Sequence, residues 1–174
     1  DLAFTPDQRL ADNARITGPD YELTALHTPG HLGGHLAFAL GDTLFSGDHV
    51  MGWSSSIVSP PDGDMGAYMA ALARLSEGTW ARFLPGHGDP VEDPSQRLRD
   101  LTRHRLQREA QILTTLSQGP SLIPDLTARI YHDTPRQLLS AAMRNVFAHL
   151  IDLQSRNLVQ ADPALHPEAR FRLA

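Results

Sequence analysis

Three short segments of the chain each place a histidine or an aspartate directly after a glycine. They are Pro29-Gly30-His31, Ser46-Gly47-Asp48 and Pro85-Gly86-His87, and each follows an apolar run. A glycine at such a point lets the backbone turn sharply off a strand and bring the next side chain into a shared cleft. Imidazole nitrogen and carboxylate oxygen are the usual ligands of a catalytic zinc-type site. The pattern therefore predicts a metal site built from strand ends.

A polar loop follows Asp48 and runs from Gly52 to Gly63. Loops of this length inside a compact domain are usually functional. Trp53 and the serines Ser54, Ser55 and Ser56 are expected to shape the mouth of a substrate site, because no Gly-x-Ser-x-Gly elbow makes any of them a nucleophile.

Two further histidines flank the expected ligands. His35 is interpreted as packing behind or supporting the site rather than contacting substrate. For His49 there are two interpretations: it supports the structure of the loop, or it lines the pocket. His104, His132, His149 and His166 are interpreted as ordinary helix or surface residues.

Strands and one helix are expected to position the ligands in the first half of the chain. Alternation predicts strands at 21–28 and 35–40, and Gly41-Asp42 turns the second into a third at 43–45. Asp64 is expected to cap a helix that ends at Gly78, and 80–84 is a short strand leading to His87. The opening 1–19 is expected to be irregular.

Helices dominate the second half. Asp93-Pro94 starts a long helix to Gln118, whose apolar side is expected to include Leu106 and Leu116. A shorter helix is predicted from Pro124 to His132. Thr134-Pro135 is expected to cap a third, and its apolar positions have helical spacing: Leu139, Ala142, Val146, Leu150 and Leu153. Segments 158–161 and 170–173 complete a winged-helix pattern as a two-stranded ribbon.

Composition limits the class of protein. With 41% hydrophobic residues the 174-residue chain can bury a core, and no apolar run approaches a membrane span. The absence of cysteines weakly favours a cytoplasmic location. All 15 basic residues are arginine, which suggests a GC-rich bacterial coding bias. Residues 1–94 carry 13 acids and four arginines, whereas the remainder carries seven acids and 11 arginines. This charge split predicts two modules, at 1–92 and 93–174, with tail arginines that either meet an anion or are solvated.

The ordered motifs Thr28-Pro-Gly-His31, Ser46-Gly-Asp48 and Pro85-Gly-His87 resemble those of the metallo-β-lactamase-fold hydrolases. His104-Arg-x-x-Arg108-Glu109 and the segments 48–56 and 60–65 are similar to the lactamase-beta-2-like branch, which carries a C-terminal winged helix. The resemblance implies an α/β (α+β) fold: the C-terminal half of an αββα sandwich followed by a winged-helix domain. It also implies two divalent metal ions, zinc or alternatively manganese or iron.

The resemblance assigns the three ligand positions. His31 would bind the first metal, Asp48 would bridge both metals and serve catalysis, and His87 would bind the second. The family's His-x-His-x-Asp-His motif is absent from the chain, so neither metal would reach tetrahedral coordination with these side chains alone. The chain is therefore expected to be the C-terminal part of a longer hydrolase, inactive in isolation, with the rest of the same domain as its partner and a homodimer possible.

The sequence is compatible with several classes of function. The leading hypothesis is a hydrolase that uses a metal-activated water on a small ester, thioester or lactam, or on an RNA phosphodiester. The alternatives are a winged-helix nucleic-acid-binding module, with Arg136, Arg144 and Arg156 on its third helix beside Asp152, and a non-catalytic scaffold or interaction module.

Overall fold

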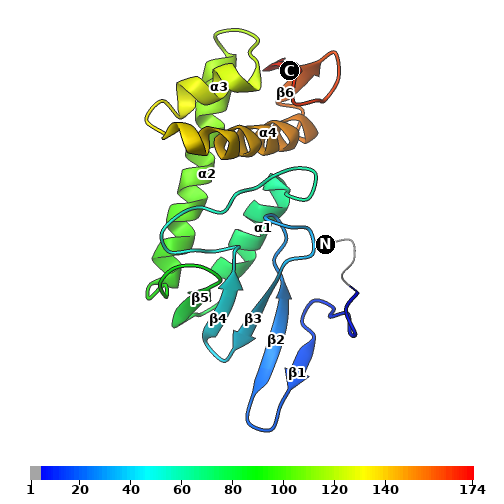
Figure 1. The fold of residues 1–174 in the computed structure, drawn as a ribbon, viewed down its shortest axis with the longest axis vertical. Helices are drawn as coiled ribbons and strands as arrows, with labels where there is room; N and C mark the ends of the chain where they lie inside the picture. The colour runs from blue at the N-terminus through cyan, green and yellow to red at the C-terminus, as the bar shows by residue number, and fades with distance from the viewer. Residues whose placement is uncertain (1–4) are drawn as a thin grey trace.

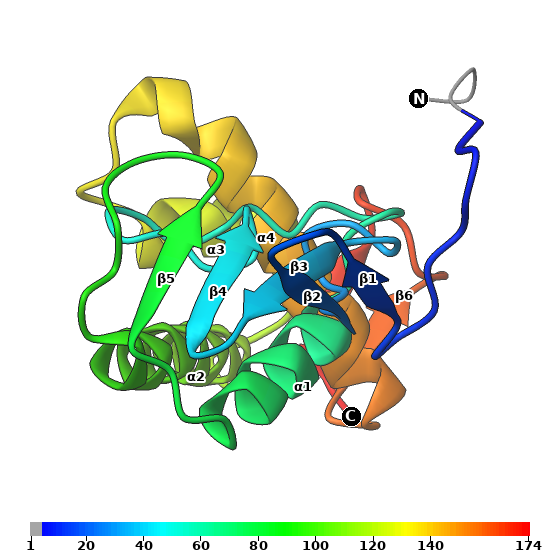
Figure 2. The same ribbon diagram turned by 90° about the horizontal axis from the view of Figure 1, so that it is seen from below.

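The computed structural model describes residues 5–174, which form a five-stranded sheet with helices on one face and a helical module above it (Figure 1). Neighbouring strands follow the chain order β1 to β5, and every pair is antiparallel except the parallel pair β4–β5. The strands are β1 (Arg15–Thr17), β2 (Glu22–His27), β3 (Leu36–Leu40), β4 (Thr43–Gly47) and β5 (Arg82–Pro85). Helix α1 (Met65–Ser76) and the long helix α2 (Pro94–Leu116) lie against the same side of this sheet (Figure 2).

The two faces of the sheet differ in what covers them. On the helix side Ala37, Leu44 and Phe83 are fully buried and form one core with Tyr68 and Leu72 of α1. On the opposite face Phe38 pairs across the strands with Phe45, and Phe45 pairs with Leu84. Phe45 is 40% exposed there. This second face is thus an apolar surface that the helices do not cover.

The sequence predictions for this half are largely confirmed. The hairpin through Gly41-Asp42 joins β3 and β4 with Leu40 opposite Thr43. Asp64 caps α1, because its Oδ1 accepts a hydrogen bond of 2.8 Å from the Ala67 amide. The expectation that 1–19 is irregular was wrong at Arg15–Thr17, which pairs with β2 as an edge strand too short to show alternation. Residues 1–4 lie outside the described part of the chain.

The second half contains the predicted winged-helix elements. They are α2, α3 (Ile123–Ile130), a 3₁₀ turn η1 (Arg136–Leu138), α4 (Leu139–Ser155) and the ribbon β6 (Val159–Asp162) with β7 (Arg170–Leu173). The predicted cap at Thr134 was wrong: α4 begins at Leu139, after η1, without a side-chain cap. No helix among the described residues is long and apolar enough to cross a membrane.

Helices α2 and α4 each contribute to two hydrophobic cores. Leu98 and Leu101 of α2 belong to the core beneath the sheet, whereas Ile112 and Leu116 belong to the core of the winged helix. Ala148 of α4 likewise belongs to the first core, and its neighbours on the helix to the second. The predicted apolar face of α2 was wrong at Leu106, which is 52% exposed. The division at residues 92/93 stays a prediction.

Arg105 is the buried cation at the junction of these cores. Its guanidinium donates to the Ser56 carbonyl and, over 3.2 Å, to Asn145 Oδ1, and it lies 4.9 Å from the centre of the Tyr68 ring. Asn145 Oδ1 also accepts a hydrogen bond of 3.0 Å from the Val58 amide. The side chain is 1% exposed. Arg105 therefore fastens the loop after Asp48 to both α2 and α4.

Replacing this cation should destabilise the whole chain. Arg105→Met removes the donors to the Ser56 carbonyl and to Asn145, so we expect the free energy of unfolding to fall by about 2–4 kcal/mol. The matched control Arg103→Met changes an exposed arginine two residues earlier on α2, and should stay within about 0.5 kcal/mol of the unchanged chain. Urea unfolding followed by circular dichroism measures both. A loss below about 1 kcal/mol for Arg105→Met would contradict the role given to it.

The buried His149 should make stability depend on pH. Burial, helped by Arg105 and His104 nearby, lowers the pKa of His149 from 6.5 to about 3. The unfolded chain binds a proton at His149 more tightly than the folded chain does. The free energy of unfolding is therefore unaffected by this group above pH 6.5 and decreases as the pH falls toward 3, by up to about 1.4 kcal/mol per pH unit for one proton. Urea unfolding at pH 7.5, 6 and 5 should show that the free energy of unfolding decreases less steeply with falling pH in His149→Leu than in the exposed control His132→Leu. Equal slopes in the two variants would refute this.

Candidate metal centre

The three predicted ligands meet at one edge of the sheet. β2 and β4 are each antiparallel to β3, and β5 is parallel to β4, so all three strands end at the same edge. His31, Asp48 and His87 follow these three strand ends. His31 Nε2 lies 3.9 Å from Asp48 Oδ2, and His87 Nε2 lies 3.6 Å from Asp48 Oδ1. The structure thus brings together the residues that the sequence placed at separate strand ends.

The glycines before these residues are needed for two different reasons. Gly30 has φ of +134°, and a Cβ there would lie 2.4 Å from the Tyr68 Cα atom. Gly86 has ordinary φ, but a Cβ there would lie 2.8 Å from Asp48 Oδ1. A hydrogen bond of 2.9 Å from the Gly86 amide to the Gly47 carbonyl holds the two strand ends side by side. The predicted sharp turn is confirmed at Gly30, whereas Gly86 is required for close approach.

Hydrogen bonds fix which atoms face the centre. His31 Nδ1 lies 2.6 Å from the Ile57 carbonyl, so Nδ1 carries the proton and the Nε2 lone pair is directed to the side of Asp48. Asp48 Oδ1 is buried and has no hydrogen-bond partner among the described residues. The Nε2 lone pair of His31 lies beside Asp48 Oδ2, and the unpartnered Oδ1 lies beside His87 Nε2. A lone pair and an unpartnered carboxylate oxygen in one cluster fit the binding of a cation.

His35 and His49 lie behind the centre. His35 Nδ1 is hydrogen-bonded to Thr28 Oγ1 at 2.8 Å, and burial lowers its pKa. His49 is fully buried, with its ring 4.6 Å from that of Tyr68, and burial lowers its pKa to about 3. Neither histidine lines the cleft. The placement agrees with a supporting role for His35 and a structural role for His49, and both roles stay predictions.

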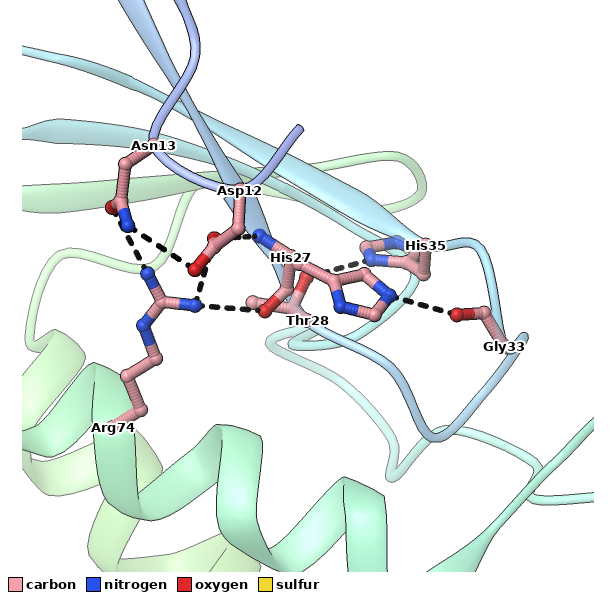
Figure 3. Close-up of polar contacts among 7 residues, drawn as sticks. All are labelled: Asp12, Asn13, His27, Thr28, Gly33, His35 and Arg74. Carbon is pink, nitrogen blue, oxygen red and sulfur yellow. Dashed lines mark hydrogen bonds and ion pairs between the residues drawn. The ribbon is translucent and has the colours of Figure 1, made fainter. Parts of the chain in front are cut away.

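A polar network fastens the loop that carries His31 (Figure 3). Arg74 of α1 donates to Asp12 Oδ1 over 2.9 Å and to the His27 carbonyl over 3.1 Å. Asp12 Oδ1 also accepts from the His27 amide at 2.7 Å, and the hydrogen bond from Arg74, followed by that from His27, lowers the Asp12 pKa. The His27 ring donates to the Gly33 carbonyl over 2.8 Å. These bonds hold both ends of the loop on which His31 sits.

The loop after Asp48 is held by arginines of α2. Arg97 donates over 2.7 Å to the carbonyl of Met51 and over 2.7 Å to that of Ser54. Ser56 donates to the carbonyls of Asp48 and His49, so its hydroxyl is not free to act as a nucleophile. The sequence interpretation of these tail arginines as solvated or anion-binding was therefore wrong for Arg97, as it was for Arg105.

A cleft of about 450 Å³ joins the centre to the winged helix. Sequence reasoning missed His104 as a cleft residue; it is half-buried and its pKa is lowered to about 4, chiefly by burial. The lining residues come from both halves: His31, Asp48, Met51, Trp53, Ser54, Ser55, Ile57, His87, His104, Arg108, Tyr131, Thr134, Leu138, Ala141, Ala142 and Asn145. Trp53, which is 71% exposed, stands at the mouth. The spacing of His104 and Arg108, one helical turn apart on α2, was the sequence signal that could have indicated this wall.

The donor set fits a shared metal site that is incomplete. The lone pair of His31, the ring of His87 and the unpartnered Asp48 oxygen are the ligand types of a zinc-type centre. Within residues 5–174, however, no group of three or more His, Asp or Glu side chains is arranged to hold a metal ion. The three side chains can therefore supply part of a coordination sphere.

Comparisons with known proteins identify two matched regions. Residues 5–87 match the family described as the metallo-beta-lactamase superfamily, and residues 123–170 match the beta-lactamase associated winged helix domain. The chain is 32% identical over 163 residues to the "Beta-lactamase-like protein 2 homolog" of Drosophila melanogaster, covering 91% of this chain and 54% of that protein. It is also 32% identical over 99 residues to the "Atrochrysone carboxyl ACP thioesterase" of Aspergillus chevalieri, covering 56% and 31%.

A solved structure shares the arrangement of both halves. The crystal structure of a metallo-beta-lactamase family protein from Thermus thermophilus superimposes with a TM-score of 0.83 at 26% identity, covering 98% of this chain and 55% of that one. The chain thus spans about half the length of the Drosophila melanogaster and Thermus thermophilus proteins. The predicted fold class is confirmed.

The close packing of Gly30 gives a test of how the His31 loop is built. Gly30→Ala places a methyl group against the Tyr68 backbone at a positive φ, so we expect the free energy of unfolding to fall by about 2–3 kcal/mol. Gly34→Ala is the matched control in the same loop, since nothing lies within 4 Å of its Cβ position, and should cost under about 0.5 kcal/mol. Urea unfolding of both variants checks this. Equal losses would show that the turn at Gly30 is not the constraint.

Proposed function

Because this chain belongs to the metallo-β-lactamase superfamily and carries its associated winged helix domain, we propose that it supplies half of the active site of a metal-dependent hydrolase. The observation that carries the proposal is Asp48, whose carboxylate lies between His31 Nε2 and His87 Nε2 with one oxygen unpartnered. His31 would hold one divalent ion, His87 would hold a second, and the Asp48 carboxylate would contribute to both.

Bound divalent ions, zinc or alternatively manganese or iron, would lower the pKa of a bound water and polarise the bond to be cleaved. The chain's own residues prepare that centre. The Ile57 carbonyl keeps His31 in the tautomer that presents Nε2, and the Asp12–Arg74 network holds the loop on which His31 lies. Trp53 and the winged-helix wall of the cleft surround the substrate.

The remaining ligands and the cover for the open sheet face would come from one further segment. The missing ligands are those of the His-x-His-x-Asp-His motif, which this chain lacks. The surface around Phe38 and Phe45 is the apolar layer on which a second sheet would pack. A segment carrying that motif on such a sheet would complete the centre and bury the surface together. A homodimer, a bacterial source and a cytoplasmic location stay predictions.

The substrate class is an ester, thioester or lactam, or an RNA phosphodiester. The thioesterase named among the relatives supports the small acyl substrates. The winged-helix alternative gains nothing from the structure, because α4 packs between the two cores and Arg156 is paired with Glu109 and Asp152. The placement of Arg136 on this helix was wrong, since it lies on η1 before α4 begins. Arg144 is exposed on α4, so one of the three arginines is left on the helix without a partner among the described residues.

The test has two parts. On the 174-residue chain we expect well under one metal per chain by plasma emission and negligible hydrolysis of a thioester panel, since ligands are missing. On a longer protein that contains both this chain and the missing motif we expect about two metals. Asp48→Asn there should lower kcat by about 100-fold or more.

The control is Asp42→Asn, which changes a carboxylate in the β3–β4 turn and should leave kcat unchanged. Two metals per chain on the 174 residues would overturn the need for outside ligands. Full activity of Asp48→Asn in the longer protein would overturn the proposal itself.

A further inference from the structure

The cleft has two ends of different chemistry. At one end lie the proposed ligands around Asp48. At the other end lie residues of the winged-helix half, among them Arg108 of α2 and Tyr131, which follows α3. The lining of the cleft as a whole is largely apolar and includes Met51, Trp53 and Leu138. Leu138 is 51% exposed and Trp53 is 71% exposed, so both present apolar surface to whatever enters.

Arg108 is held in place without being neutralised. Its Nη1 donates over 3.0 Å to the Ile130 carbonyl and over 2.9 Å to Gln111 Oε1, and its guanidinium carbon lies 4.4 Å from the centre of the Tyr131 ring. No carboxylate within residues 5–174 forms an ion pair with Arg108. The adjacent Glu109 is paired with Arg156 instead. Nε is buried and has no partner among the described residues.

A guanidinium fixed in this way is prepared for an oxyanion. Arginine donates in a rigid fork that matches a carboxylate or a phosphate, and stacking on an aromatic ring reduces the entropy lost when the anion binds. Its neighbour His104 lines the same cleft and adds no competing negative charge. The winged-helix wall of the cleft therefore provides one arginine in largely apolar surroundings.

The number of cations decides between two kinds of substrate. A single-stranded RNA needs basic groups repeated along its backbone and aromatic surfaces for successive bases. Within the described residues this cleft offers one arginine. A small molecule with one anionic group and an apolar body matches one arginine flanked by Trp53 and Leu138.

We propose that Arg108 selects the substrate of this site by binding an oxyanion, typically a carboxylate, of a small molecule whose apolar body lies along Trp53 and Leu138. The scissile bond then lies toward Asp48. This rests on the proposed hydrolase for the chemistry, but the binding itself does not require metal. Arg108 acts here in specificity and takes no part in proton transfer or in bond cleavage.

The experiment measures binding to the metal-free 174-residue chain at about pH 8 with EDTA, where carboxylates are ionised. Trp53 and Trp80 are the two tryptophans of the chain, and the indole of Trp80 is bonded over 2.8 Å to the Leu75 carbonyl, away from the cleft. Their indole N–H signals in a ¹⁵N–¹H spectrum are assigned with Trp53→Phe. Titration with 4-nitrobenzoate should move the Trp53 signal and leave that of Trp80 in place.

Matched probes separate charge from shape. The neutral isostere 4-nitrobenzamide should bind roughly ten-fold more weakly than 4-nitrobenzoate, since it lacks the charge-assisted bond. 4-Nitrophenyl phosphate identifies the source of the oxyanion: tighter binding than the benzoate would assign the site to phosphomonoesters. Equal affinity for benzoate and benzamide would overturn the proposal without any variant being made. Tighter competition by a single-stranded oligoribonucleotide would overturn it in favour of RNA.

Variants locate the effect on one residue. Arg108→Gln should remove the preference for benzoate over benzamide, and Arg108→Lys, which keeps the charge and guards against a folding defect, should retain part of it. Arg103→Gln, on the outer side of α2, should bind the benzoate as the unchanged chain does. A preference that survives in Arg108→Gln would refute the assignment. Loss of hydrolysis in the longer protein would leave these measurements unchanged, so the two proposals fail separately.

Discussion

The structure depends on one buried guanidinium, and no buried carboxylate among residues 5–174 balances its charge. Arg105 uses its donors on the Ser56 carbonyl and on Asn145, and its flat face on Tyr68, so three segments must be present for its charge to be accommodated. Burying a charge without such partners would cost several kcal/mol. The loop after Asp48, α2 and α4 are thereby bound into one arrangement. The winged helix is consequently part of the structure of the site and not a separate appendage.

Strand direction supplies the second constraint. Since β2, β4 and β5 run the same way, the residues that follow them must meet, and the hydrogen bond from Gly86 to Gly47 fixes how closely two of these ends approach. Glycine at 86 then leaves room for the Asp48 carboxylate. The geometry of the centre is therefore a consequence of backbone pairing, and the network of Arg74 and Asp12 stabilises the loop that carries His31.

Local signals in the sequence predicted what local physics decides. The turn at Gly41-Asp42, the cap at Asp64 and the helical spacing within 139–153 each depend on residues a few positions apart, and each is confirmed. The motifs around His31, Asp48 and His87 were predictable for the same reason. The role of Arg105 was not, because its partners lie 40 and 49 positions away. The sequence pattern of a helix is the same whether an arginine on it faces water or donates to a buried carbonyl.

The wall of the cleft formed by Arg108 and Tyr131 could not be predicted from local sequence signals either. It also shows that the cleft is divided between the two halves of the chain. Both residues belong to the winged-helix half, whereas His31, Asp48 and His87 belong to the sheet. Because Arg97 and Arg105 hold the intervening loop to α2, the two walls of the cleft keep a fixed separation. Residues that face the substrate from the helical side can then change without displacing the proposed ligands. The proposed reaction chemistry and the proposed substrate choice thus belong to different parts of the chain, and the buried arginines physically link those two parts.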